Sequence, residues 1–192
     1  ECILHESVVI FMVKGGEFVS RVVLWLYRKE LRLFFYINHK LHHAILQYIL
    51  NILTHIGGAA VTIVSTLSIA LFSEGTLSKT GWQAFTALSV SHLPVAVIKR
   101  LYPRLRPYLA LPETNIGKQV LKDHSFPSGH TTAVFASITP FVLAYPITSF
   151  ILIPIAFIVA FSRIYLGLHY PSDCAGGMMI GTGIAYLSAM VI

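Results

Sequence analysis

Long apolar runs separated by short charged segments dominate the chain. Four runs lack Asp, Glu, Lys and Arg altogether: 41–73, 81–98, 125–162 and 174–192. A membrane-spanning helix needs about 20 mostly apolar residues. Each run therefore predicts one span, except that 125–162 has room for two spans joined by a tight turn near Tyr145–Pro146. The pattern predicts an all-α, polytopic transmembrane bundle of five spans, or six if another span precedes them.

The first 40 residues mix apolar and basic positions. A sixth span would lie within residues 5–27, where Lys14, Glu17 and Arg21 interrupt the apolar pattern. Residues 28–40 place leucines and phenylalanines among cations, which predicts an amphipathic helix at the membrane interface. A plain extension of the preceding span is the alternative. No small-residue cleavage site follows a clean apolar core, so we do not expect a cleavable signal peptide.

Composition favours a membrane protein. Of the 192 residues, 55% are hydrophobic and 11% are charged, whereas about 25% of the residues in a soluble domain are charged. We therefore expect residues 1–192 to form a single integral-membrane domain. The net charge of +6 comes from basic residues beside the apolar runs, which favours anionic headgroups or phosphates as partners over nucleic acid. Cys2 and Cys174 form no metal-binding or redox pattern.

The first of three polar motifs is KRLYPRLRP at residues 99–107. Lys99 and Arg106 bracket a proline-containing turn that can bring both cations over one pocket. Lysine supplies a point charge and arginine a planar fork that fits two phosphate oxygens. The alternative is a basic patch that binds anionic lipid. This motif opens a polar connection, residues 99–125, which we interpret as an active-site loop.

The second motif, Pro127-Ser128-Gly129-His130, precedes an apolar helix. A serine hydroxyl and free backbone N–H groups at a helix N-terminus suit an anion, and Gly129 lets the backbone come close to it. His130 can donate a proton to a leaving oxygen near neutral pH. A plain helix cap beside an interfacial histidine is the alternative interpretation of these residues.

The third motif, SRIYLGLHYPSD at residues 162–173, contains Arg163, His169 and Asp173. A carboxylate on one imidazole nitrogen sets the tautomer and leaves the other nitrogen free as a nucleophile. Arg163 lies at the edge of an apolar span, where it is unfavourable unless an anion pairs with it. A structural ion pair between Arg163 and Asp173 is the alternative. If each span crosses the bilayer once, all three motifs lie on one face.

Two further features bear on the structure. Asp123 and His124 lie close to the expected pocket, where contact with substrate and a loop role are equally compatible with the sequence. Gly177 and Gly181 have the spacing that lets helices approach closely. We expect these two glycines to pack within the chain, and dimerisation is the alternative.

Together the motifs resemble the signature of the type-2 phosphatidic acid phosphatase superfamily of integral-membrane lipid phosphatases. That signature has a Lys, six residues and Arg-Pro; then Pro-Ser-Gly-His; then Ser-Arg, five residues, His, three residues and Asp. The chain matches every position in order, with these residues: Lys99, Arg106, Pro107, Pro127, Ser128, Gly129, His130, Ser162, Arg163, His169 and Asp173.

The resemblance implies a role for each side chain. His169 would attack phosphorus to form a phosphohistidine, with Asp173 orienting its ring, and His130 would protonate the leaving lipid oxygen. The reaction would need no metal or other cofactor. The phosphoryl oxygens would be held by the remaining residues of the signature: Lys99, Arg106, Ser128, the Gly129 backbone and Arg163.

The substrate and the membrane face are less constrained. We favour undecaprenyl diphosphate as substrate over phosphatidylglycerol phosphate or phosphatidic acid, although the motifs do not separate a diphosphate from a monophosphate. The rival is a non-catalytic lipid-binding or transport protein on the same fold. The positive-inside rule puts the basic face in the cytoplasm. Cations that are present for catalysis do not report the orientation of the protein, however. The resemblance implies a multi-pass protein of the cell membrane with an extracytoplasmic site.

Overall fold

The computed structural model describes residues 17–117 and 121–192, with the backbone alone at 17–20. This part of the chain is all-α and contains eight α-helices and no strand. The elements, in chain order, are α2 (Glu17–Phe35), the π-helical turn η1 (Tyr36–Lys40), α3 (Ala44–Leu53), the 3-10 turn η2 (Thr54–Gly57), α4 (Ala59–Phe72), α5 (Gly75–Leu101), α6 (Pro107–Ala110), α7 (Gly129–Ala144), the 3-10 turn η3 (Pro146–Thr148), α8 (Ser149–Tyr165) and α9 (Pro171–Val191).

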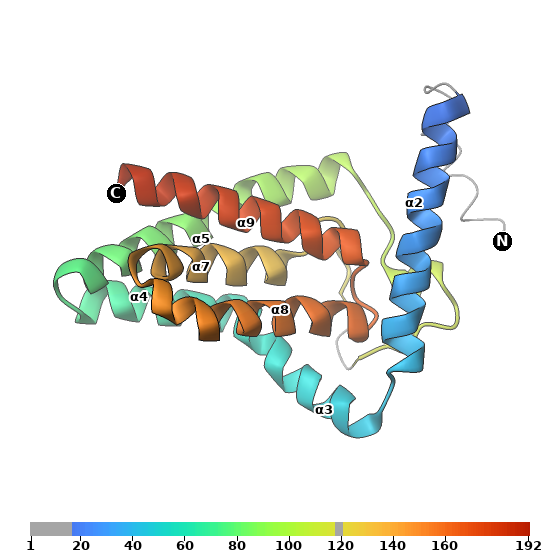
Figure 1. The fold of residues 1–192 in the computed structure, drawn as a ribbon, viewed down its shortest axis with the longest axis horizontal. Helices are drawn as coiled ribbons and strands as arrows, with labels where there is room; N and C mark the ends of the chain where they lie inside the picture. Colours follow the sequence, from blue (N-terminus) through green and yellow to red (C-terminus); the bar gives the residue numbers. More distant parts are fainter. Residues whose placement is uncertain (1–16, 118–120) are drawn as a thin grey trace.

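Helix α7 lies at the centre of a bundle formed with α4, α5, α8 and α9 (Figure 1). Residues 131–137, about two turns of α7, are all buried. A helix that is buried on every side is typical of the middle of a bundle. Small side chains let its neighbours come close, because Ala87 of α5 and Ala185 of α9 pack with Ala136 of α7.

The expected spans are confirmed in part. By length and hydropathy, two described stretches qualify as spans, 146–165 and 171–191, and a third candidate is α3–η2 together with α4, which is bent by 47°. Helix α7 is apolar but shorter, with 16 residues. Helix α5 covers the predicted 81–98 span and extends beyond both of its ends. The total of five to six spans therefore stays a prediction.

Local signals place most of the helix boundaries. The predicted turn near Tyr145–Pro146 is confirmed, since α7 ends at Ala144 and η3 follows. The last helix begins at Pro171, ahead of the apolar run that starts at Cys174. Proline suits the first turn of a helix, where its missing N–H is not needed. Asp173 is consequently part of the first turn of α9.

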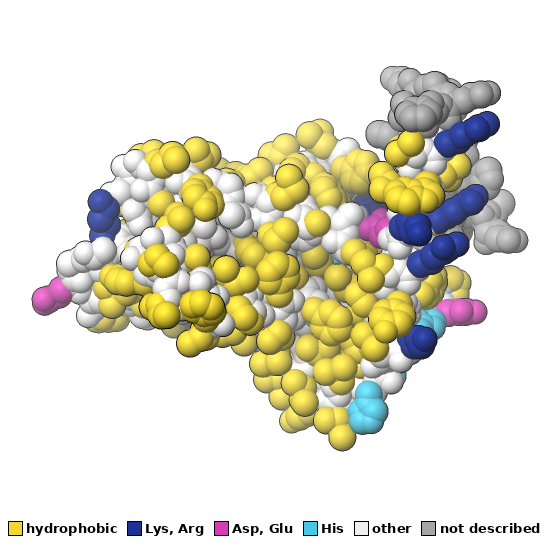
Figure 2. Space-filling view, in the orientation of Figure 1, with side chains coloured by type: hydrophobic (Ala, Val, Ile, Leu, Met, Phe, Trp, Pro, Cys, Tyr) yellow, Lys and Arg dark blue, Asp and Glu magenta, His cyan; other side chains and the backbone are white. Residues whose placement is uncertain are grey.

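Helix α2 runs across one end of the bundle (Figure 1). It continues without a break into η1, so residues 28–40 extend the helix that precedes them. Residues 5–16 of the expected sixth span lie outside the described residues. Phe34 is fully buried against Tyr170 at the start of α9. Arg28 and Arg32 are exposed, and Figure 2 shows cations along this helix.

Helices α7 and α9 touch at two glycines, which places the predicted close approach within the chain. A Cβ atom on Gly181 would lie 2.4 Å from the carbonyl oxygen of Thr132 and 2.9 Å from the backbone nitrogen of Ala136. A Cβ atom on Gly177 would lie 2.6 Å from the carbonyl oxygen of Ser128. The second contact joins α9 to the first residues of α7, where the second motif lies.

We predict that Gly181→Ala destabilises the protein by about 1–3 kcal/mol, the usual range for overpacking. The obstructing atoms are backbone and cannot rotate away. Gly183→Ala is the matched control, because a Cβ atom there would meet nothing within 4 Å. Thermal unfolding of both variants in detergent tests this, and equal midpoints would contradict the α7–α9 packing.

Candidate active site

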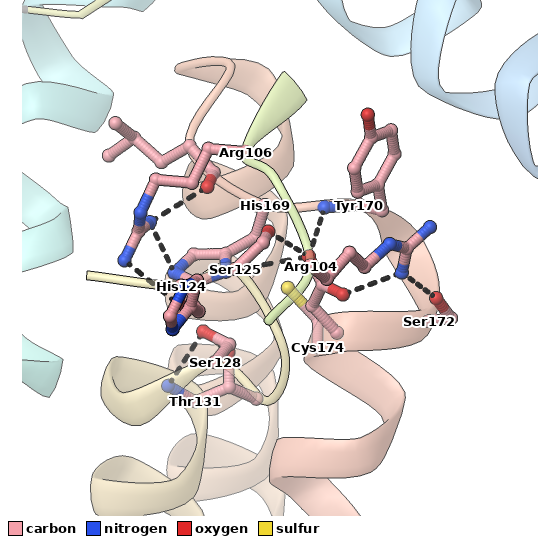
Figure 3. Close-up of polar contacts among 12 residues, drawn as sticks. Arg104, Arg106, His124, Ser125, Ser128, Thr131, His169, Tyr170, Ser172 and Cys174 are labelled. Carbon is pink, nitrogen blue, oxygen red and sulfur yellow. Dashed lines mark hydrogen bonds and ion pairs between the residues drawn. The ribbon is translucent and has the colours of Figure 1, made fainter. Parts of the chain in front are cut away.

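The three motifs meet at the end of the bundle that α2 crosses (Figure 3). Lys99 lies in the last turn of α5, and Arg106 precedes α6. Ser128 caps α7, and His130 lies in its first turn. The third motif contributes Arg163 in the last turn of α8 and Asp173 in the first turn of α9, with His169 in the loop between them.

His169 is buried between a carboxylate and a guanidinium. Its Nδ1 lies 3.6 Å from Oδ2 of Asp173. On the other side, Nη1 of Arg106 donates to Nε2 of His169 over 3.1 Å. An Nε2 that accepts this bond carries a lone pair, so the ring proton belongs on Nδ1, facing Asp173. Burial lowers the pKa of His169 to about 4 despite the nearby carboxylate, so the imidazole is neutral at pH 7.

Asp173 is fully buried and held by several donors. Its Oδ2 accepts hydrogen bonds from the Tyr170 backbone N–H at 2.7 Å and from the Ser125 hydroxyl. Its Oδ1 accepts from Nη1 of Arg104 at 2.7 Å. The expected alternative, an ion pair between Arg163 and Asp173, is wrong, because Arg104 occupies that position.

Arg163 is fully buried and mostly unpaired within the described part of the chain. Its Nη1 donates to Oγ1 of Thr54 in η2 over 2.8 Å. Its Nε and Nη2 atoms are buried and have no hydrogen-bond partner among the described residues. A buried guanidinium with free N–H groups is unfavourable. The arrangement therefore fits a site where an anion completes these hydrogen bonds.

Lys99 and Arg106 share one carboxylate. Nζ of Lys99 lies 2.6 Å from Oδ2 of Asp123, and Nη2 of Arg106 lies 2.7 Å from its Oδ1. Burial disfavours the charged form of Asp123, but the hydrogen bonds and charges of Lys99 and Arg106 outweigh it and lower the pKa of Asp123 to about 2. The two cations are therefore spaced to be bridged by two oxygens of one anion.

The N-terminus of α7 completes the arrangement. The Ser128 side chain accepts from the backbone N–H and the hydroxyl of Thr131, at 3.5 and 3.0 Å. The Ser128 backbone N–H donates to the Asp173 carbonyl at 3.0 Å, which fixes α7 against α9. His130 is partly buried and lies close to the charged guanidinium of Arg163 and to His169. A Cβ atom added to Gly58 would lie 3.8 Å from its Nε2, so η2 borders this histidine.

Several residues at the site were not predicted as functional from the sequence. Arg104 lies within the polar connection 99–125, so its position was a usable signal, whereas Asp123 in the same connection was left open between substrate contact and a loop role. Ser125 borders the second motif but belongs to a common residue type. Glu30 and Thr54 lie far from the motifs in the chain, and no sequence pattern connects them with the site.

The chain matches the model of the PAP2 superfamily over residues 80–192, a range that contains every residue of the three motifs. This chain belongs to the PAP2 superfamily. The resemblance expected from the motifs is thus confirmed. Helices α2, α3 and α4 precede the matched range.

Curated relatives of this PAP2 chain include the putative undecaprenyl-diphosphatase YbjG of Escherichia coli. It is 33% identical over 138 residues, which are 69% of this chain and 67% of YbjG. The chain spans about half the length of other curated relatives that it matches. These relatives are named as phosphatases or as a transport permease, and those named as phosphatases act on lipid phosphates.

Two solved structures have a fold similar to that of this chain. The crystal structure of Aquifex aeolicus LpxE has a TM-score of 0.74 and 26% identity, covering 83% of this chain and 94% of LpxE. A transmembrane PAP2-type phosphatidylglycerolphosphate phosphatase from Bacillus subtilis has a TM-score of 0.71 and covers 95% of this chain and 92% of its own. Its 20% identity shows a shared fold alone.

Proposed function

We propose that this chain is a metal-independent lipid phosphatase that works through a phosphohistidine on His169. The observation that carries the proposal is Arg163, whose buried Nε and Nη2 groups have no partner among the described residues and lie in the same motif as the neutral His169. Three cations, Lys99, Arg106 and Arg163, supply the charge that a phosphoryl group needs when no metal is bound.

In the first step, the Nε2 lone pair of His169 attacks the terminal phosphorus, and the bond between this phosphorus and the oxygen that links it to the rest of the lipid breaks. His130 gives its proton to that leaving oxygen. Asp173 stabilises the charge that forms on the imidazole, because its Oδ2 faces Nδ1. In the second step, water attacks phosphorus, His130 takes the water proton, and the bond between phosphorus and Nε2 breaks to release phosphate.

For this mechanism Arg106 must move. In the described geometry it donates to Nε2 of His169, the atom that attacks phosphorus. A phosphate bound at the site offers the guanidinium a charged acceptor, which is a stronger partner than a neutral imidazole. Substrate binding would thus expose the nucleophile as it takes up the cation.

We favour undecaprenyl diphosphate as the substrate, with phosphatidylglycerol phosphate or phosphatidic acid as the alternative. Support comes from YbjG, whose name specifies undecaprenyl diphosphate. The test is phosphate release by the purified protein in detergent, with chelator present, from undecaprenyl diphosphate and phosphatidylglycerol phosphate side by side. Release from either supports a metal-independent lipid phosphatase, and the faster substrate identifies the preference. If folded protein releases phosphate from neither lipid, undecaprenyl diphosphate and phosphatidylglycerol phosphate are both wrong as substrates.

The membrane placement is part of the same proposal. We propose five to six spans, with residues 28–40 at the membrane interface and the active site on the extracytoplasmic face. The course of α2 across the bundle end supports the interfacial part of this placement (Figure 1). Its exposed side chains divide into adjacent basic and apolar stripes that suit headgroups and acyl chains: Arg21, Arg28 and Arg32 on one, Val22, Leu26 and Leu33 on the other.

We predict that Glu113→Cys, in a Cys2→Ser background, reacts with a membrane-impermeant maleimide added to intact cells. Glu113 is exposed in the loop after α6, at the site end of the bundle. Glu74→Cys is the matched control, because Glu74 is exposed in the α4–α5 turn at the opposite end and should stay unlabelled. The reverse pattern would place the site in the cytoplasm.

A further inference from the structure

Arg104 lies next to the active site but faces away from the space where a phosphate would bind. One of its terminal nitrogens, Nη1, donates to Oδ1 of Asp173 and to Oγ of Ser172, each over 2.7 Å. The other, Nη2, donates to Oε2 of Glu30 over 2.8 Å. The guanidinium carbon lies 4.0 Å from the centre of the Tyr170 ring. Arg104 and Arg106 thus approach the catalytic histidine and aspartate from opposite sides (Figure 3).

Glu30 belongs to α2, which lies outside the range matched by the PAP2 model. Its Oε1 accepts from the backbone N–H of Ser172 at 3.0 Å and from the Ser172 hydroxyl. A carboxylate at this point satisfies a free N–H in the first turn of α9 and interacts favourably with the helix dipole. Glu30 therefore touches both Arg104 and the turn of α9 that carries Asp173.

We propose that Glu30 and Arg104 are positioning residues, which hold the Asp173 carboxylate in place toward His169 and connect α2 to the reaction. This inference rests on the proposed function. Neither residue touches the phosphate in the proposed mechanism, because both ends of the Arg104 fork are already occupied by carboxylates and by Ser172.

The geometry explains why the pair is needed. Asp173 lies 3.6 Å from Nδ1 of His169, beyond hydrogen-bond distance, so its attraction for the imidazole depends on where the carboxylate is held. Arg104 fixes Oδ1, which leaves Oδ2 facing the imidazole. Side chains that orient a reacting group in this way are typically worth 10- to 100-fold in function, by analogy with the outer ligands of metal sites.

Charge balance gives Glu30 its own role. Arg104 alone would neutralise Asp173 and weaken its pull on a positively charged His169. With Glu30 present, the three groups carry one net negative charge beside the imidazole. Burial acts to lower the pKa of Arg104, but the charges of Asp173 and Glu30 outweigh it and raise it, so Arg104 stays charged between them.

The experiment compares Glu30→Gln, Arg104→Gln and the double variant in the full chain, measuring kcat, KM and inhibition by vanadate, a phosphate mimic. We expect kcat to fall roughly 10- to 100-fold in each single variant, with KM and vanadate inhibition near wild type. Because Glu30 acts through Arg104, kcat of the double variant should fall no further than kcat of Arg104→Gln alone. Arg104→Lys should recover part of the loss, since it keeps the charge.

Matched controls remove a carboxylate or a guanidinium at positions outside the site. Glu74→Gln and Arg100→Gln each replace an exposed side chain, and wild-type kcat is expected for both. A thermal unfolding scan of every variant identifies protein that has not folded, and if Arg104→Gln fails this scan, Glu30→Gln and Arg104→Lys carry the comparison.

Three results would overturn an assignment. Wild-type kcat in Glu30→Gln and Arg104→Gln, with His169→Ala inactive, would remove the positioning role and leave the proposed function standing. A weakening of vanadate inhibition equal to the loss of kcat/KM would make Arg104 a phosphate ligand. Activity near wild type in His169→Ala would instead remove the proposed function itself.

Discussion

Replacing His169 by alanine is expected to lower phosphate release by roughly 10⁴-fold or more, the scale seen when a covalent nucleophile is removed. No other imidazole in the described chain lies between a buried carboxylate and an arginine, as His169 does. His130 is close, but its proposed role is proton transfer, so it does not replace the nucleophile. The measurement is the initial rate of phosphate release at saturating substrate.

His92→Ala is the control for this prediction. His92 is an exposed histidine of α5 whose Nδ1 contacts the Leu88 carbonyl at 2.7 Å, within its own helix. Its removal takes away an imidazole without touching the site, so activity should be unchanged. If His169→Ala kept more than a few per cent of the wild-type rate, the covalent mechanism would be wrong.

Replacing Arg163 by methionine is expected to lower kcat/KM by about 10²–10³-fold, the loss typical of one donor to a developing oxyanion. At the same time the thermal midpoint should stay equal or rise. The reason is that Arg163 is fully buried and two of its nitrogens have no partner in the described part of the chain, so the folded state carries an unfavourable charge that methionine does not have.

The opposite directions of these two changes distinguish a functional cation from a structural one. A structural Arg163 would lose stability along with activity, and that outcome would contradict the anion-binding role. Arg163→Lys should keep part of the activity, because a charge without the fork still attracts phosphate. Arg100→Met, at an exposed position on α5, should leave both quantities unchanged.

Much of the site was predictable because its residues occur as short motifs at the ends of apolar runs. Charge is unfavourable at such positions unless chemistry or solvent requires it, so Arg163 and Lys99 stood out. The topology then implied that the three motifs lie on one face, and the structure places them at one end of the bundle. The turn at Tyr145–Pro146 followed from length alone.

Other features depend on contacts between distant segments, which no local pattern records. Arg163 contacts Thr54, 109 positions away, and Arg104 contacts Glu30, 74 positions away. The alternative interpretation, an ion pair between Arg163 and Asp173, is wrong for the same reason, because Arg104 from a distant segment occupies the carboxylate. The start of α9 at Pro171 lies ahead of the apolar run, because polar residues at a helix start do not extend such a run.

Asp123 occupies the same two cations that are proposed to bind the phosphate, so a bound anion must displace its carboxylate. Its carboxylate already pairs with both Lys99 and Arg106 and stays ionised, because those cations hold its pKa at about 2. Since Asp123 is tethered to the chain, it competes at a high local concentration. A singly charged headgroup gains little by displacing it, whereas the doubly charged end of a phosphate monoester or diphosphate gains a stronger attraction. We therefore expect the loop to favour doubly charged phosphate groups over the singly charged phosphodiester lipids of the bilayer.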